Sequence, residues 1–125
     1  MHLLLDTHTL IWWLANNPTL SDTAFDAIAS SNNLVFISAA SVWEIAIKKS
    51  LGKLQAPDDL KQQLEKQRFT SLPINIDHAL AIKELPYHHK DPFDRILIAQ
   101  AMYEQLTIVS RDRLIAAYDI AIIKS

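Results

Sequence analysis

The segment His2-Leu3-Leu4-Leu5-Asp6, followed by Thr7-His8-Thr9-Leu10-Ile11-Trp12-Trp13-Leu14-Ala15, largely decides the fold. A short apolar run such as residues 3–5 is typical of a strand that is buried on both faces of a sheet. The next residues have helical character until Asn16-Asn17-Pro18, a sequence that favours a turn. A buried strand that leads through an aspartate into a helix predicts an α/β protein.

The same alternation continues along the rest of the chain. Proline at position 73 argues for an edge strand there, because proline cannot donate a hydrogen bond to a neighbouring strand. The further expected strands are residues 34–37, 71–74, 106–109 and 120–123, and the further expected helices begin at Ser21-Asp22, Ser41, Pro57, Asp77 and Asp91-Pro92. Short connections between these elements predict one domain, residues 1–125, with a mostly parallel central sheet sandwiched by helices.

Composition excludes several classes of function. Half of the 125 residues are hydrophobic and 21% are charged, as in a globular protein. The absence of cysteine rules out disulfides and thiolate zinc sites. A single glycine, Gly52, rules out a phosphate-binding loop and a dinucleotide fingerprint, which need several glycines. No signal peptide or membrane span is evident, so we expect a cytoplasmic protein without membrane association.

The charges are unevenly distributed. Residues 1–47 contain no lysine or arginine, and all 12 of these residues lie in residues 48–125. The net charge of −2 does not by itself indicate a protein that binds nucleic acid. Singly, the lysines are explained by an ordinary solvated surface.

Four acids are candidates for function: Asp6, Glu44, Asp94 and Asp112. Each has a structural alternative, because Asp6 and Asp112 could cap helices, Glu44 has capping-box spacing from Ser41, and Asp94 follows the well-capped start Asp91-Pro92. These alternatives do not explain why all four should lie near one edge of the sheet, where α/β proteins bind ligands. Clustered carboxylates repel one another, whereas Mg²⁺ or Mn²⁺ would hold them together. The pattern therefore predicts a divalent-metal site.

Four segments that contain these acids resemble the acidic motifs of the PIN domain, and the VapC toxins of toxin–antitoxin systems in particular. The segments are Leu4-Leu5-Asp6-Thr7-His8, Trp43-Glu44-Ile45-Ala46, Asp94-Arg95-Ile96-Leu97-Ile98-Ala99-Gln100-Ala101 and Ile108-Val109-Ser110-Arg111-Asp112. The run His88-His89-Lys90-Asp91-Pro92-Phe93-Asp94-Arg95 is similar to one VapC subgroup. The resemblance implies an endoribonuclease that depends on Mg²⁺ or Mn²⁺. It also implies an RNA substrate, with transfer RNA among the candidates, and an antitoxin whose tail covers the groove that contains these acids.

The resemblance assigns roles to individual residues. Asp6, Glu44, Asp94 and Asp112 match the catalytic and metal-binding acids, with Asp94 fitting the third position better than Asp91 and the number of metal ions left open. Supporting roles around the metal go to the hydroxyls of Ser110 and Thr7 and to Asp91, which caps the helix. The candidates to hold RNA phosphates are Arg95, Arg111 and Lys90.

Alternative functions and two further sequence features complete these expectations. A non-catalytic PIN-fold RNA-binding module is one alternative. A phospho-receiver signalling domain is another, although Asp6 lacks the acidic neighbour that such a domain needs, and a haloacid-dehalogenase phosphatase is disfavoured by His8. The other histidines, including the adjacent His88 and His89, do not have the spacing of a metal site. Adjacent Trp12 and Trp13 cannot both face one core, so we expect one to cover a homodimer or partner interface.

Overall fold

The computed structural model describes residues 1–125 and contains one five-stranded sheet in which all neighbouring strands are parallel. The strands are β1 (His2–Leu5), β2 (Leu34–Ser38), β3 (Phe69–Leu72), β4 (Thr107–Val109) and β5 (Ile122–Ile123). Their order in the sheet is β3-β2-β1-β4-β5. The α/β class, the parallel sheet and its five strands are thus as predicted, and β3 lies at an edge, although it ends at Leu72, before Pro73.

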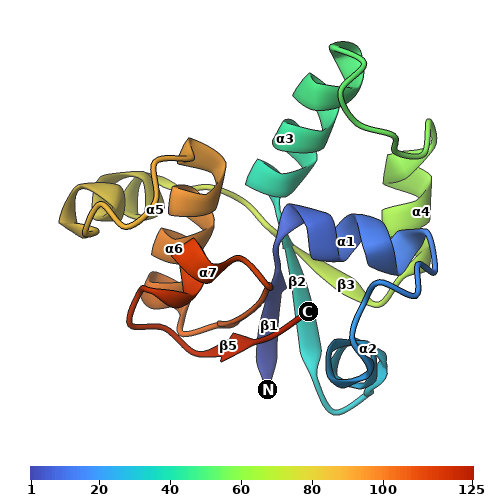
Figure 1. Ribbon diagram of the computed structural model, residues 1–125, viewed down its shortest axis with the longest axis horizontal. Coiled ribbons are helices and arrows are strands. Elements are labelled where there is room, and N and C mark those ends of the chain that lie inside the picture. Colours follow the sequence, from blue (N-terminus) through green and yellow to red (C-terminus); the bar gives the residue numbers. More distant parts are fainter.

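Helices cover both faces of the sheet (Figure 1). In chain order they are α1 (Thr7–Leu14), α2 (Asp22–Ala29), α3 (Ala39–Ser50), α4 (Leu60–Lys66), α5 (Ile76–Ala81), the 3-10 turn η1 (Ile82–Glu84), α6 (Pro92–Glu104) and α7 (Arg113–Ala116). Helices α5, α6 and α7 lie to one side of the sheet, and α1, α2 and α4 lie to the other. None of these helices combines the length and the hydrophobicity that a membrane-spanning helix requires.

The alternation of side chains along β1 divides the core into two parts. Leu4 points to one face and joins the cluster that includes Leu97 and Ile98 of α6. Leu3 and Leu5 point to the other face and join the cluster that includes Leu10 of α1. All three leucines of β1 are 0% exposed, which explains why this strand reads as a continuous apolar run.

Three helix starts differ from the expected ones: α4 begins at Leu60 and not at Pro57, and α3 and α5 take other caps. Helix α3 begins at Ala39 and is capped by the side chain of Ser38, so Ser41 lies inside the helix with its buried Oγ unpartnered. The capping-box explanation of Glu44 is therefore wrong. Helix α5 is capped by Asn75, in a capping box with His78, and not by Asp77. In both cases another polar residue a few positions earlier in the chain takes the cap.

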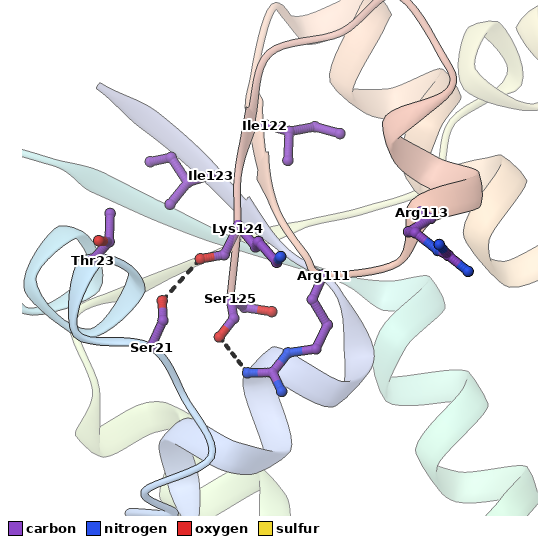
Figure 2. Close-up of a pocket in the computed structure, with 8 residues that line it drawn as sticks. All are labelled: Ser21, Thr23, Arg111, Arg113, Ile122, Ile123, Lys124 and Ser125. Atoms are coloured by element: carbon purple, nitrogen blue, oxygen red, sulfur yellow. Dashed lines mark hydrogen bonds between the residues drawn. The ribbon is translucent and has the colours of Figure 1, made fainter.

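The strand order places the carboxyl ends of β1 and β4 side by side. Leu5 pairs with Val109, and the chain then continues into Asp6 on one side and into Ser110-Arg111-Asp112 on the other. This is the point at which the strand order reverses, where α/β proteins bind their ligands. The last residues run beside the start of α2, where the backbone N–H of Ser21 donates to the carbonyl of Ser125 and its hydroxyl donates to that of Lys124 (Figure 2).

Candidate active site

The four candidate acids and Asp91 line one cavity of about 430 Å³. They come from four separate segments: the β1–α1 junction, the middle of α3, the start of α6 and the segment between β4 and α7. Thr7 and Arg111 also line this cavity. The structure thus brings together residues that are up to about a hundred positions apart in the chain. We refer to this cavity of about 430 Å³ as the acid cavity.

Asp6 and Asp112 are helix caps as well as cavity residues. Oδ1 of Asp6 accepts a hydrogen bond from the backbone N–H of Thr9 at 2.9 Å, and Oδ1 of Asp112 accepts one from Leu114 at 2.8 Å. A carboxylate has two oxygens, so capping leaves Oδ2 of each residue for another partner. The capping alternative is correct for both residues, and it does not exclude a functional role.

Glu44 is 4% exposed and is held by two donors. The hydroxyl of Thr7 donates to Oε1 at 2.7 Å, and Nζ of Lys48 donates to Oε2 from one helical turn further along α3. The hydrogen bond with Glu44 raises the pKa of Lys48, and the charges of Asp91 and Asp94 raise it further. Lys48 therefore brings a fixed positive charge to the acid cavity, which it also lines.

Asp91 and Asp94 divide two tasks at the start of α6. Oδ1 of Asp91 accepts from the backbone N–H groups of Phe93 and Asp94 at 2.8 and 3.2 Å, which confirms it as the N-cap. Burial, followed by the charge of Asp91, raises the pKa of Asp94 to about 7; His89 opposes this shift, and Asp6 and Glu44 add to it. The crowding of carboxylates that the sequence predicted is therefore present and centres on Asp94.

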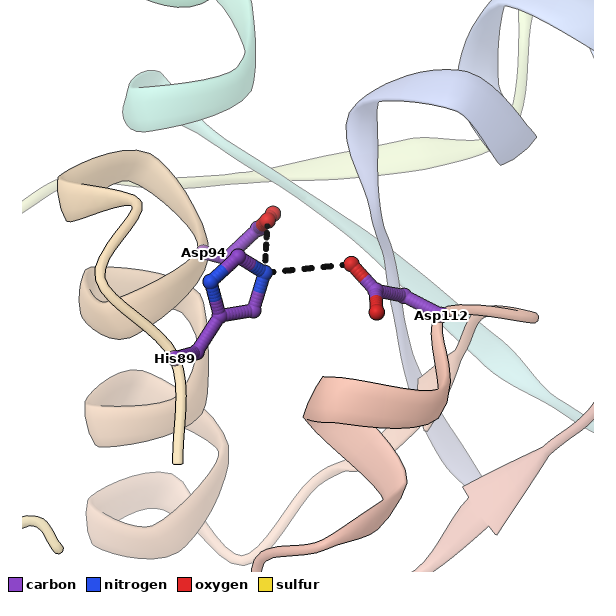
Figure 3. Close-up of side chains that lie close together, drawn as sticks. All are labelled: His89, Asp94 and Asp112. Carbon is purple, nitrogen blue, oxygen red and sulfur yellow. Dashed lines mark hydrogen bonds and ion pairs between the residues drawn. The ribbon is translucent and has the colours of Figure 1, made fainter. Parts of the chain in front are cut away.

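His89 joins Asp94 to Asp112 (Figure 3). Its Nε2 lies 2.8 Å from Oδ2 of Asp94 and 3.1 Å from Oδ2 of Asp112. The backbone N–H of Asp91 donates to Nδ1 at 3.2 Å, so the ring proton sits on Nε2, which donates to the two carboxylates. His89 therefore lies within the site, which the spacing of the histidines in the sequence did not indicate. His89, Asp94 and Asp112 each offer one potential metal-ligand atom, and these three atoms lie within 4.8 Å of one another. Nε2 of His89 could bind a metal only if its proton moved to Nδ1.

Arg95 does not bind RNA from the position that the fold gives it, because it is 5% exposed. Its guanidinium donates to the carbonyls of Pro86 and His89, to those of Ile82 and Leu85 and to the hydroxyl of Tyr118. The sequence suggested a phosphate contact because an arginine follows an acid of the site. Its helical position instead turns the side chain into the protein.

The remaining predicted residues lie in different surroundings. Arg111 lines the acid cavity, stacks on Trp12 at 4.3 Å and donates to the carbonyls of Thr19 and Ser125. Ser110 is 2% exposed and its hydroxyl accepts the backbone N–H of Asp112 at 3.1 Å, so it steadies the segment that carries this acid. Lys90 is exposed and is not among the residues that line the acid cavity.

Five residues that line the acid cavity were not among the predicted site residues: His8, Trp12, Lys48, His89 and Ser125. The i,i+4 spacing of Glu44 and Lys48 on a helix could have indicated that pair. Trp12 lines the acid cavity, while Trp13 packs against Phe25 and donates to Gln67. Neither is largely exposed, whereas Trp43 is 58% exposed and packs edge-on against Phe93. The expected interface role of Trp12 or Trp13 stays a prediction.

The fold and the acid cavity define an α/β domain with clustered acids at the reversal point of a fully parallel sheet. The sequence matches the family described as "PIN domain" over residues 3–121, and the chain belongs to this family. Phospho-receiver domains share the flavodoxin-like strand order 2-1-3-4-5, which differs from the order 3-2-1-4-5 found in this chain. The receiver alternative is therefore wrong.

Solved structures with the same fold include several toxin–antitoxin complexes. VapBC2 from Rickettsia felis, bound to a DNA fragment from its promoter, superposes with a TM-score of 0.74 at 15% identity, covering 98% of each chain. FitAcB from Neisseria gonorrhoeae superposes with a TM-score of 0.68 at 21% identity, covering 98% of this chain and 96% of that one. VapBC-5 from Mycobacterium tuberculosis gives a TM-score of 0.62 at 18% identity, covering 99% and 98%. A comparison with curated proteins gave no match.

Proposed function

We propose that this chain is an endoribonuclease that depends on Mg²⁺ or Mn²⁺ and that Asp6, Glu44, Asp94 and Asp112 are its catalytic acids. One observation carries the proposal: acids from four separate segments of the chain line a single cavity at the carboxyl edge of the sheet. Such a concentration of carboxylates destabilises a protein unless something compensates for the repulsion. A divalent cation is the compensating group that this set of oxygen donors fits.

Asp6, Asp94 and Asp112 would hold the cation, and Glu44 would hold a second cation or a water molecule. Asp6 and Asp112 each use Oδ1 for capping, so the cation could bind Oδ2 of Asp6 directly and Oδ2 of Asp112 in place of the hydrogen bond from His89. Burial and the neighbouring carboxylates raise the pKa of Asp94, and a bound cation would favour its charged form. When bound, the cation would acidify a water molecule and stabilise the negative charge that develops on the phosphoryl oxygens.

The residues of the chain then orient the substrate and the acids around it. Arg111 would contact a phosphate beside the acid cavity, since it lines that cavity and donates hydrogen bonds to two carbonyls that fix it. Ser110 and Thr7 hold Asp112 and Glu44 in position through hydrogen bonds. In-line attack by water on phosphorus would break the P–O3′ bond, leaving a 5′-phosphate on one product and a 3′-hydroxyl on the other.

We further propose that the chain is the toxin of a toxin–antitoxin pair. The similar structures are complexes of that kind, including one from Klebsiella pneumoniae at 20% identity. The antitoxin would offer an arginine or lysine to the carboxylates, because a buried guanidinium or ammonium can pair with them in place of a metal. Transfer RNA as substrate, a homodimer and a cytoplasmic location belong to this same proposal.

The test is cleavage of single-stranded RNA by the purified protein. The unmodified chain should cut RNA in Mn²⁺ and not in EDTA, and the products should carry 5′-phosphates. Asp6→Asn and Asp112→Asn should each abolish cutting, because each removes a charge while keeping the side-chain shape. Asp26→Asn is the matched control, since Asp26 is exposed on α2 away from the acid cavity, and it should cut normally.

The non-catalytic RNA-binding alternative makes a different forecast in the same assay. Lys48 and His89 already donate to carboxylates in the acid cavity, which is the observation that favours a site without metal. Under that alternative the chain would bind RNA equally well in EDTA and Mn²⁺ and would leave it intact. Binding without cutting in Mn²⁺ would replace the nuclease proposal with this one.

A further inference from the structure

A second hollow lies along the outer edge of β5, next to the acid cavity (Figure 2). It has a volume of about 880 Å³ and is bordered by the start of α2, the start of α7 and the last residues of the chain. Its charged lining consists of Arg111, Arg113 and Lys124, and none of its eight lining residues is acidic. We refer to this hollow as the basic groove.

The basic groove and the acid cavity share a boundary. Arg111 and Ser125 line both of them. Arg111 is fixed at this boundary because it stacks on Trp12 and donates to the carbonyls of Thr19 and Ser125 at 2.6 and 2.5 Å. A linear polymeric ligand with one group in the acid cavity can therefore continue past Arg111 into the basic groove.

The other two cations of the basic groove carry uncompensated charge. Arg113 and Lys124 are exposed, and their side chains form no ion pair. By contrast, Lys48 and Lys49 on α3 are each paired with an acid. A hollow whose charged side chains are all positive concentrates the electrostatic field and attracts anions. The ligand of the basic groove should therefore be anionic along its length.

We propose that the basic groove binds the phosphodiester backbone of a single-stranded nucleic acid whose neighbouring phosphate lies at the acids. The inference rests on the proposed function, because a nuclease with a phosphate at its acids must also hold the flanking phosphates. A single strand carries one charge per nucleotide, so it supplies the anionic groups required at Arg111, Arg113 and Lys124 in succession. RNA and DNA share this backbone, and the experiment separates them.

The experiment measures binding in EDTA, where no cutting is expected. Fluorescent single-stranded RNA and DNA of the same sequence are titrated with the protein at several KCl concentrations. The test variant is the double substitution Arg113→Gln with Lys124→Gln. The matched control is Lys61→Gln with Lys66→Gln, which removes the same charge from exposed positions on α4. Circular dichroism checks that both variants are folded.

Each phosphate contact with a single strand contributes about 0.7 to the slope of log K against log salt. The groove variant should therefore lose about 1.4 from the slope and bind roughly 25-fold more weakly at about 0.1 M KCl, while the control should keep the slope of the unmodified chain. Tighter binding of RNA than of DNA would identify RNA as the occupant, and the reverse result would identify DNA.

Two results would overturn the inference. One is an equal slope in the groove variant and the control, which would mean that Arg113 and Lys124 contact no phosphate. The other is equal binding of polyglutamate and RNA, lost together in the groove variant, which would assign the groove to an acidic peptide. Neither depends on catalysis, so failure of the groove is distinguishable from failure of the nuclease, which would show as binding without cutting in Mn²⁺.

Discussion

Three of the carboxylates that line the acid cavity also cap helices. Asp6, Asp91 and Asp112 each cap a helix through Oδ1. The caps fix the side-chain directions, because each carboxylate is tied to a backbone N–H of the helix that it begins. Asp94 has no such cap to make, and its burial, followed by the nearby charge of Asp91, is why the pKa shift falls on this residue.

The raised pKa of Asp94 predicts how the metal-free protein responds to pH. In the unfolded chain this group titrates near its ordinary value of 3.8, whereas in the folded protein it titrates at about 7. Between these values the folded protein holds a proton that the unfolded chain has lost. This contribution to the free energy of unfolding therefore falls as pH rises, by at most about 1.4 kcal/mol per pH unit, and levels off above pH 7.

Asp94→Asn should remove this decrease in the free energy of unfolding with rising pH. Urea unfolding in EDTA at pH 5, 6, 7 and 8 should show the variant gaining stability relative to the unmodified chain up to pH 7, with a constant difference above it. Parallel stability curves for the two proteins would contradict the assigned pKa.

At the residue scale the acids were predictable from sequence and their neighbours were not. Asp6 and Asp112 follow apolar strands, a pattern that places them at a sheet edge. His89 lies in an irregular segment, where no periodicity indicates the direction of a side chain. Arg95 was predicted to contact RNA phosphate, and its burial was not foreseen because arginine is seldom buried.

At the element scale, Arg95 organises the segment that leads into α6. It donates to four carbonyls between Ile82 and His89, and the hydroxyl of Tyr118 donates to Pro86 and accepts from the backbone N–H of His89. This irregular segment thus obtains the hydrogen bonds that a helix or strand would otherwise supply. His89 reaches Asp94 and Asp112 because its backbone is held in this way.

Arg95→Met should destabilise the protein by at least about 3 kcal/mol, because four carbonyls of this segment lose a charged donor. The control is Arg68→Met, since Arg68 is exposed and makes one hydrogen bond, to Ala29, and it should change stability by less than about 1 kcal/mol. Urea unfolding measures both. Equal losses in the two variants would mean that Arg95 does not organise this segment.

The elements themselves were largely predictable, and their boundaries were less so. β1, β2 and α6 carry strong signals, namely buried apolar runs and the Asp91-Pro92 start. The start of α3 was misplaced because Ser38 and Ser41 are both acceptable caps by sequence. The choice depends on tertiary contacts, since the hydroxyl of Ser38 also donates to the buried Gln100 of α6 at 2.6 Å.

At the scale of the whole molecule, the site exists because of the strand order. β1 pairs with β4, although more than 100 residues separate Leu3 from Thr107, its partner. That pairing sets Asp6 beside the segment of Asp112, and the packing of α3 and α6 against the sheet adds Glu44 and Asp94. Local patterns do not determine which strands become neighbours, so the sequence predicted the acids but not the geometry that joins them.

The most direct test of the acid cavity as a divalent-cation site is the melting temperature in EDTA and in Mn²⁺. A cation that binds only the folded state at 100 times its Kd stabilises it by about 2.7 kcal/mol, or roughly 10 °C for a domain of this size. The unmodified chain and the Asp26→Asn control should gain this much, and Asp6→Asn should gain little because it has lost a ligand charge. A melting temperature that is the same in EDTA and in millimolar Mn²⁺ would contradict the account.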